Sequence, residues 1–112
     1  MLTQYINELR RRVHSIDATP EDGLLFAYAK AYYKGEAALK KYRDRLVVRE
    51  INAVYDTNAQ LAFLFNQASK PEEYAAYQAF RVLCKQKADE KMSSLKDELE
   101  TALSVLKQEE KE

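Results

Sequence analysis

Apolar residues recur at steps of four and three along the first turns of the chain, which is the spacing of one face of an α-helix. They are Leu2, Ile6, Leu9, Val13 and Ile16. Arg10 to Arg12 lie mostly off this narrow stripe, as expected for a side that faces solvent. The pattern predicts a first helix that ends near Asp17.

A second helix is predicted to start at Thr19-Pro20, because Thr is a good N-cap and Pro is tolerated at the first helical position. The residues from Leu24 to Tyr33 are apolar over a broad face, which is typical of a helix between neighbours. Gly35 follows, and it is compatible with a kink, a C-cap or a tolerated interior position. Because Glu36 to Lys41 are strong helix formers, we expect a continuous or merely bent helix here.

The continuation of this helix carries an apolar set inward and a basic stripe, at four-residue steps, on another face. The apolar set is Leu39, Tyr42, Leu46, Val47, Ile51, Val54 and Tyr55, and the stripe is Lys41, Arg45 and Arg49. The helix should end at residues 56–58, where Thr57 and Gln60 have the spacing of a capping box. A short apolar helix is predicted over residues 59–65.

The stretch from Ser69 to Glu73 predicts the start of a long last helix, with Pro71 in its first turn and two acids favoured by the helix dipole. The later part of this helix has a second narrow stripe, formed by Ala88, Met92, Leu95, Leu99, Ala102 and Leu106. Residues 107–112 are expected to fray. The first and last helices can pair within one chain or between chains, since either pairing covers both stripes.

The composition favours helices throughout. The 112 residues are 46% hydrophobic and 32% charged, and only two are Gly and two Pro. This length suits one domain and is too short for two ordinary ones. We predict an all-α fold of four to five helices, a helical bundle with long helices in the N-terminal half and at the C-terminus, as a single domain over residues 1–112.

The charges and the cysteine count indicate the compartment of the protein and the classes of partner that it does not bind. Eighteen Lys and Arg balance eighteen Asp and Glu, so no net field attracts nucleic acid or anionic lipid. Neither a bilayer-spanning stretch nor a signal-peptide pattern is seen. The single cysteine, Cys84, excludes an internal disulfide and fits a reducing compartment. We expect a soluble cytoplasmic protein that binds neither membranes nor nucleic acid.

The residue types offer little for catalysis. His14 is the single histidine, which leaves no His-based metal cluster and no triad, and we expect it to be half exposed. Cys84 lies about four turns into its helix, away from the N-terminus that would activate a thiolate. Two glycines cannot form the usual phosphate-binding loop. We therefore predict no catalytic residue, no metal and no cofactor, and a protein that is not an enzyme.

Eight tyrosines and no tryptophan are the most unusual feature of the composition. The commoner use of such tyrosines is at the edges of a core, with hydroxyls that reach water. Beside arginines, they would instead suit a nucleotide or another planar anion. The candidate ligand face consists of Tyr28, Tyr32, Tyr42, Arg45 and Arg49.

A motif of caps and core positions runs from Arg43 to Lys91. It comprises Val54-Tyr55, the apolar run Leu61 to Leu64, Lys70-Pro71-Glu72-Glu73-Tyr74, Tyr77 and Cys84-Lys85. This motif resembles a helical module of small proteins encoded in phage and prophage genomes, often near tail genes. The chain departs from that module at Phe63 and Phe65 and in its N-terminal extension. The resemblance implies a viral origin and an interaction role, and it carries over no functional residue.

We therefore expect a phage-type protein that binds other proteins, as a tail-region assembly or accessory factor, and that associates with itself. The contacts expected for self-association are Leu2, Ile6, Leu9, Val13, Met92, Leu95, Leu99 and Leu106. Such a protein would work in the host cytoplasm or on the virion. The alternative is a small ligand-binding or host-defence-inhibiting module that uses the Tyr/Arg face.

Overall fold

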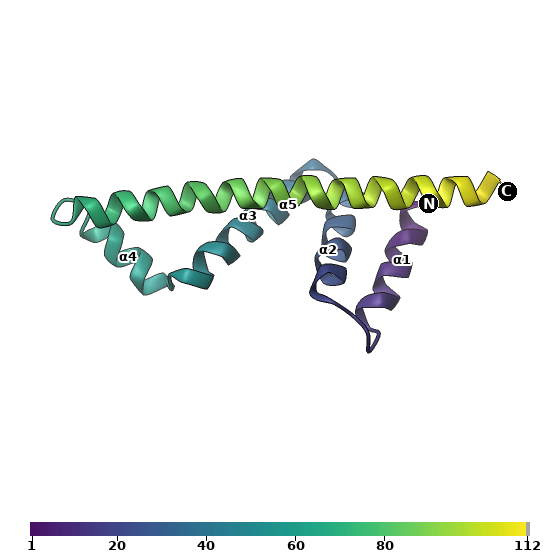
Figure 1. The fold of residues 1–112 in the computed structure, drawn as a ribbon, viewed down its shortest axis with the longest axis horizontal. Coiled ribbons are helices and arrows are strands. Elements are labelled where there is room, and N and C mark those ends of the chain that lie inside the picture. Colours follow the sequence, from purple (N-terminus) through teal and green to yellow (C-terminus); the bar gives the residue numbers. More distant parts are fainter. Residues whose placement is uncertain (112) are drawn as a thin grey trace. The chain divides into compact units, whose positions relative to one another are not determined.

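Five α-helices make up the described part of the chain, which contains no strand (Figure 1). The structure, a computed structural model, describes the backbone of residues 1–111 and the side chains of residues 1–108. The helices are α1 (Leu2–Val13), α2 (Pro20–Lys34), α3 (Glu36–Val54), α4 (Thr57–Phe65) and α5 (Pro71–Lys111). The predicted all-α fold of four to five helices is confirmed.

The chain divides into two compact units. Unit 1 comprises Met1–Tyr42 and the chain from Lys91 onward, and unit 2 comprises Arg43–Glu90. The helices α3 and α5 each contribute residues to both units. Each unit has buried apolar side chains of its own. The single domain over residues 1–112 stays a prediction.

The core of unit 1 is built from α1, α2, the first part of α3 and the last part of α5. Helix α1 packs against α2. The side chains of Leu9, Leu95 and Leu99 are at most 1% exposed, and burying a leucine contributes about 1.5–3 kcal/mol. An ion pair of 2.7 Å between Lys91 and Glu21 joins α5 to α2. The two ends of the chain thus share one core.

This core contains the centres of both apolar stripes. Of the eight residues predicted as interface contacts, Ile6, Leu9, Leu95 and Leu99 are buried, and Leu2, Val13, Met92 and Leu106 are half-buried. Burial raises the pKa of the Tyr5 hydroxyl on α1, and the carboxylate of Glu98 on α5 acts in the same direction. The centres of both stripes are therefore covered within a single chain.

Helix α1 ends earlier than predicted. It ends at Val13, because the Ser15 amide donates to the Arg12 carbonyl at 3.0 Å and the Ser15 hydroxyl accepts from the Asp17 amide at 3.2 Å. Ser favours such local hydrogen bonds over a continued helix. Ile16 is 99% exposed in this turn, so its assignment to the apolar stripe was wrong.

Helix α2 starts as predicted. The Thr19 hydroxyl accepts from the Asp22 amide at 3.3 Å, and the Asp22 carboxylate accepts from the Thr19 amide at 3.0 Å. This reciprocal pair is a capping box, and Pro20 takes the first helical position, which needs no amide donor. The start of α2 is therefore fixed by residues next to it in the sequence.

Gly35 breaks the helix that was expected to continue through it. Its φ of 117° and ψ of −173° lie in a region that is essentially restricted to glycine. Its amide donates to the Ala31 carbonyl at 3.0 Å and its carbonyl accepts from the Leu39 amide at 3.1 Å. Gly35 thus ends α2 and begins α3 in one residue, and the prediction of a continuous or bent helix was wrong.

Helix α5 starts at Pro71 as predicted. It is helical through Lys111, past residue 107, where fraying was expected to begin. The residues after Leu106 are Lys, Gln and Glu, which are good helix formers and extend the helix. Residue 112 lies outside the described part of the chain.

Candidate functional site

The short helix α4 shapes the candidate site in unit 2. Its N-cap is Asp56, whose carboxylate accepts a 2.7 Å hydrogen bond from the Ala59 amide. The predicted cap, Thr57, is already the first helical residue, so the prediction was wrong by one position. The Asp56 carboxylate takes the third amide of the helix, which is the usual partner of an N-cap side chain.

Gln60 links the three helices of unit 2 instead of closing a capping box. Its amide nitrogen donates to the Asn52 side chain on α3 at 2.8 Å and to the Tyr55 carbonyl at 3.0 Å. Its amide oxygen accepts a 2.8 Å hydrogen bond from the Tyr77 hydroxyl on α5. Both of its N–H donors and its oxygen are therefore used. This network joins α3, α4 and α5 through one side chain.

Four aromatic rings pack beside this network. The Tyr55 ring meets the rings of Phe63, Tyr77 and Phe80 edge-on, with centroids 5.2, 5.8 and 5.3 Å away. Phe63 and Tyr77 stack with centroids 5.0 Å apart. Edge-on pairs contribute about 0.5–1.5 kcal/mol beyond their buried area. The rings and Gln60 together fix α4 in unit 2.

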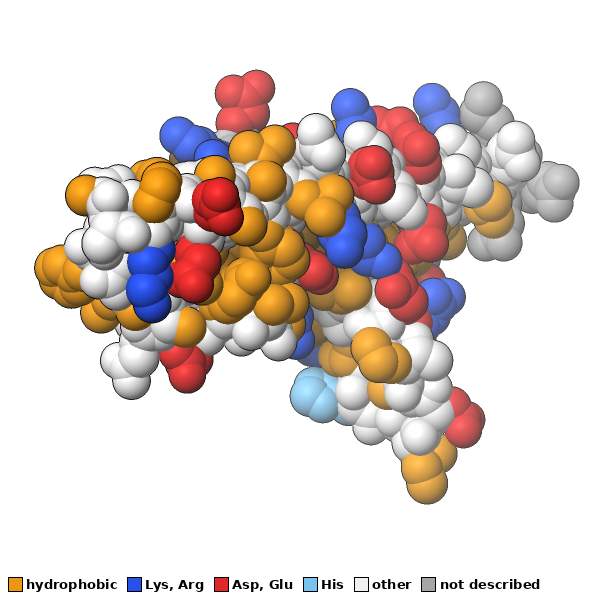
Figure 2. All heavy atoms as spheres, turned by 60° about the vertical axis from the view of Figure 1, so that its left-hand side comes forward, with side chains coloured by type: hydrophobic (Ala, Val, Ile, Leu, Met, Phe, Trp, Pro, Cys, Tyr) orange, Lys and Arg blue, Asp and Glu red, His pale blue; other side chains and the backbone are white. Residues whose placement is uncertain are grey.

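A groove of about 310 Å³ opens between α3, α4 and α5. Its apolar lining consists of Val48, Ile51, Leu61, Leu64 and Tyr77, and its polar lining of Asn52, Thr57, Gln60 and Arg81. Leu61 and Leu64 are each 44% exposed, and Phe65 at the end of α4 is 82% exposed. Figure 2 shows hydrophobic side chains gathered on the part of the molecule that carries α4. Unit 2 therefore leaves much of the apolar surface of α4 uncovered.

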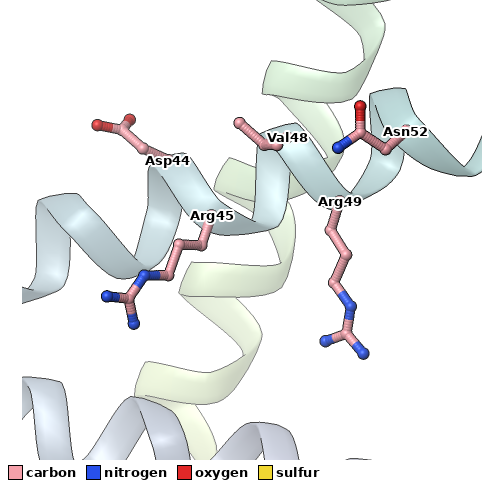
Figure 3. A pocket seen from close by; sticks show the side chains of 5 residues that line it. All are labelled: Asp44, Arg45, Val48, Arg49 and Asn52. Atoms are coloured by element: carbon pink, nitrogen blue, oxygen red, sulfur yellow. The ribbon is translucent and has the colours of Figure 1, made fainter. Parts of the chain in front are cut away.

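A second hollow of about 350 Å³ lies on the adjacent surface of α3 and shares Val48 and Asn52 with the groove. In Figure 3, Arg45 and Arg49 extend from one edge of α3, and Asp44, Val48 and Asn52 extend from the other. Asp44 has an ion-pair partner, Arg43, at 3.4 Å. Arg45 and Arg49 have none among the described residues. The groove thus continues into a hollow with two unpaired cations.

The residues of the predicted Tyr/Arg face do not belong to one unit. Tyr28 and Tyr42 are 3% and 9% exposed in unit 1, where their rings meet with centroids 6.2 Å apart. The Tyr42 hydroxyl donates to the Leu24 carbonyl at 3.1 Å, and burial raises the pKa of Tyr28. Arg45 and Arg49 belong to unit 2, whereas the third tyrosine, Tyr32, is in unit 1 and 36% exposed. Tyr28 and Tyr42 are therefore core residues.

The two remaining candidates for chemistry, Cys84 and His14, belong to different units. Cys84 is 1% exposed; burial raises the pKa of its thiol, and the Glu50 carboxylate adds to the rise. His14 is exposed at the end of α1. Among the described residues, no three His, Cys, Asp or Glu side chains are grouped so that they could hold a metal. None of the described helices is both long and apolar enough to cross a membrane.

The groove does not coincide with any site predicted from the sequence. Leu61 and Leu64 were predicted only as part of a short apolar helix over residues 59–65. A signal was nevertheless present: residues 61–65 are an uninterrupted apolar run, and a nine-residue helix that is apolar on all sides cannot bury every side against one neighbour. No residue of α4 is in fact fully buried.

The motif of residues 43–91 lies almost entirely in unit 2. Its capping and apolar positions include Tyr55, Leu61, Leu64 and Tyr77, all of which surround or line the groove. Cys84 is a buried residue of this motif, and Pro71 starts α5.

Protein-family models, curated proteins and solved structures were compared with the chain, and none of them matched it.

Proposed function

We propose that this chain acts by binding another protein through unit 2, and not by catalysis. The observation that carries the proposal is the exposure of Leu61, Leu64 and Phe65 on α4, beside a groove. Single exposed apolar residues are common, but apolar side chains clustered around a hollow with a polar rim are typical of interaction sites.

The way unit 2 is built supports a binding role. The groove walls come from α3, α4 and α5. Hydrogen bonds of the Gln60 side chain connect these three helices, and the aromatic rings around Tyr55 pack between them. A surface that is already ordered loses less conformational entropy when it binds. The groove is therefore suited to receive a partner without refolding.

The resemblance of residues 43–91 to a phage-encoded module points to the same class of function. A tail-region assembly or accessory factor, active in the host cytoplasm or on the virion, is the form of it that we propose. In this proposal the partner can be a second copy of the chain. Because the centres of both terminal stripes are buried in unit 1, self-association would then use the groove face of unit 2.

Photo-crosslinking at a single position tests the proposal. A photoreactive phenylalanine analogue replaces Leu64 in the full chain, and the control carries it at Ile16, which is also apolar and 99% exposed but lies in unit 1. We expect an adduct with one defined protein at position 64 only, and a complex of the purified pair that Leu61→Ser weakens. An adduct of two copies of the chain would identify the partner as itself. The absence of an adduct, or equal adducts at both positions, would refute the proposal.

A further inference from the structure

We infer that the groove of unit 2 receives an amphipathic helix of a partner protein whose apolar face is flanked by Asp or Glu. The inference rests on the proposed function and specifies the partner's chemistry. Two observations carry it: the apolar lining of the groove, and the arginines beside that lining, which are Arg81 in the groove and Arg45 and Arg49 in the adjoining hollow.

The shape of the receiving surface favours a helix. A partner strand needs a sheet edge to pair with, and the described residues form no strand. Proline-rich segments dock in grooves lined by aromatic rings, whereas this lining is mainly aliphatic, with Tyr77 as its one ring. An amphipathic helix places apolar side chains at positions i, i+3, i+4 and i+7 into an aliphatic groove between helices. That mode fits Val48, Leu61 and Leu64.

The charges favour acidic flanks. Arg45 and Arg49 line the hollow that continues the groove, and Arg81 lines the groove itself. None of the three has an ion-pair partner among the described residues, whereas Arg43 in the same unit pairs with Asp89 at 2.9 Å. The guanidinium of Arg81 lies over the Tyr77 ring, 5.8 Å from its centroid, which holds the cation at the groove.

A single helix can meet both sets of cations. Val48 and Asn52 belong to the groove and to the hollow, so the two surfaces are continuous. A helix with its side chains is about 10–12 Å across, so acids on its two flanks can face opposite sides of the site. Carboxylates there would gain charge-assisted hydrogen bonds from arginines that have no ion-pair partner among the described residues. The net charge of the whole chain is zero, so the selectivity comes from these local charges.

A display library of helical peptides tests the inference with the full chain as bait. Each peptide carries Leu or Ile at i, i+3, i+4 and i+7, with Glu and Lys equally represented at the flanking positions. We expect selected binders to carry Glu over Lys by about tenfold or more, as charge complementarity at an interface predicts. The bias should decrease at about 0.5 M salt, where exposed charges are screened.

Variants connect the bias to the named residues. The double variant Arg45→Glu/Arg49→Glu should reverse the preference for Glu over Lys, and Leu64→Ser should abolish peptide binding. The control Arg11→Glu, on the exposed surface of α1, should change neither the binding nor the preference for Glu. Circular dichroism checks that each variant is folded.

Several outcomes would overturn the inference. They are an absence of binders, binders without a charge bias, a bias that the arginine variants leave intact, and Leu64-dependent sedimentation with anionic vesicles, which would indicate a membrane surface instead. If any of these occurs while photo-crosslinking at position 64 still yields a defined partner protein, the proposed function stands and only its acidic-helix form fails.

Discussion

The hydroxyl of Tyr77 donates a 2.8 Å hydrogen bond to the amide oxygen of Gln60. Tyr77 is 3% exposed, so water does not easily replace this partner. Because the other side of Gln60 is bound to Asn52, one hydroxyl on α5 helps to hold α3 and α4 in place. Tyr77 therefore lines the groove and also helps to hold the three helices of unit 2 together.

Tyr77→Phe is expected to lower the free energy of unfolding by about 1–2 kcal/mol, because it leaves the Gln60 oxygen without its buried donor. Denaturant unfolding measures the loss. Tyr33→Phe is the matched control, since Tyr33 is 64% exposed, and it should have almost no effect. Equal stabilities of the two variants would contradict the role of the hydrogen bond.

Gly35→Ala should destabilise the protein by about 1–3 kcal/mol, because alanine is strained at a φ of 117°. Gly23→Ala is the matched substitution inside α2, where an added methyl group meets nothing within 4 Å. It should stabilise by about 0.5–1 kcal/mol, through helix propensity. Thermal unfolding of both variants gives the comparison. If both are stabilised, the helix does not break at Gly35.

Asp56→Ala should cost about 1 kcal/mol, the usual loss when an N-cap is removed. Thr57→Ala should cost much less, because the Thr57 side chain does not cap α4. Hydrogen exchange of the Ala59 amide, which donates to Asp56 at 2.7 Å, should accelerate in the first variant only. Faster exchange of the Gln60 amide in the Thr57 variant would instead restore the original capping prediction, in which the Thr57 hydroxyl accepts from that amide.

The ion pair between Arg43 and Asp89 predicts a dependence of stability on pH. The hydrogen bond that the Asp89 carboxylate accepts from Arg43 lowers the pKa of Asp89 below its ordinary value. A carboxylate whose pKa is lower in the folded state stabilises above the unfolded-state pKa of about 3.9, and this contribution is lost as the pH falls through the folded-state value.

The variant Asp89→Asn should therefore be slightly less stable than the original protein at neutral pH. It should also lose less stability when the pH falls below about 4. Unfolding curves at several pH values measure both effects. Asp17→Asn serves as the control, because Asp17 is exposed without an ion-pair partner among the described residues. An unchanged acid dependence in the Asp89 variant would show that the pair does not contribute.

Cys84 should react slowly with a thiol reagent in the native protein and quickly in denaturant. The thiol is 1% exposed, and burial raises its pKa, so little thiolate is present at neutral pH. Absorbance from a chromogenic disulfide reagent follows the reaction. Native-state reaction at the rate of a free thiol would place Cys84 at the surface.

Features set by neighbours in sequence were predictable. Thr19 with Pro20, and Pro71, mark helix starts through interactions within one turn, and both starts are where the pattern placed them. The helix break at Gly35 was not predictable in this way. The residues on both sides are helix formers, and only the fold selects between the helical and the positive-φ conformation of glycine.

The groove was also beyond the sequence. Its lining comes from positions 48, 61 and 77 among others, and their proximity depends on how three helices pack. Helical spacing predicts which residues share a face of one helix, but it does not tell whether a neighbour covers that face. For this reason Ile6 and Leu99, expected at an interface between chains, are buried within one chain, and Leu64 is exposed.

Unit 1 is discontinuous: α1, α2 and the first part of α3 come from the first 42 residues, and the last part of α5 comes from residue 91 onward. A ribosome therefore makes all of unit 2 before it makes Leu95 and Leu99, which are buried in unit 1 together with Leu9. The nascent chain carries exposed apolar helices throughout that interval, and such surfaces attract chaperones or aggregate. Synthesis of the intervening 48 residues sets the delay before the amino-terminal helices acquire their last neighbour.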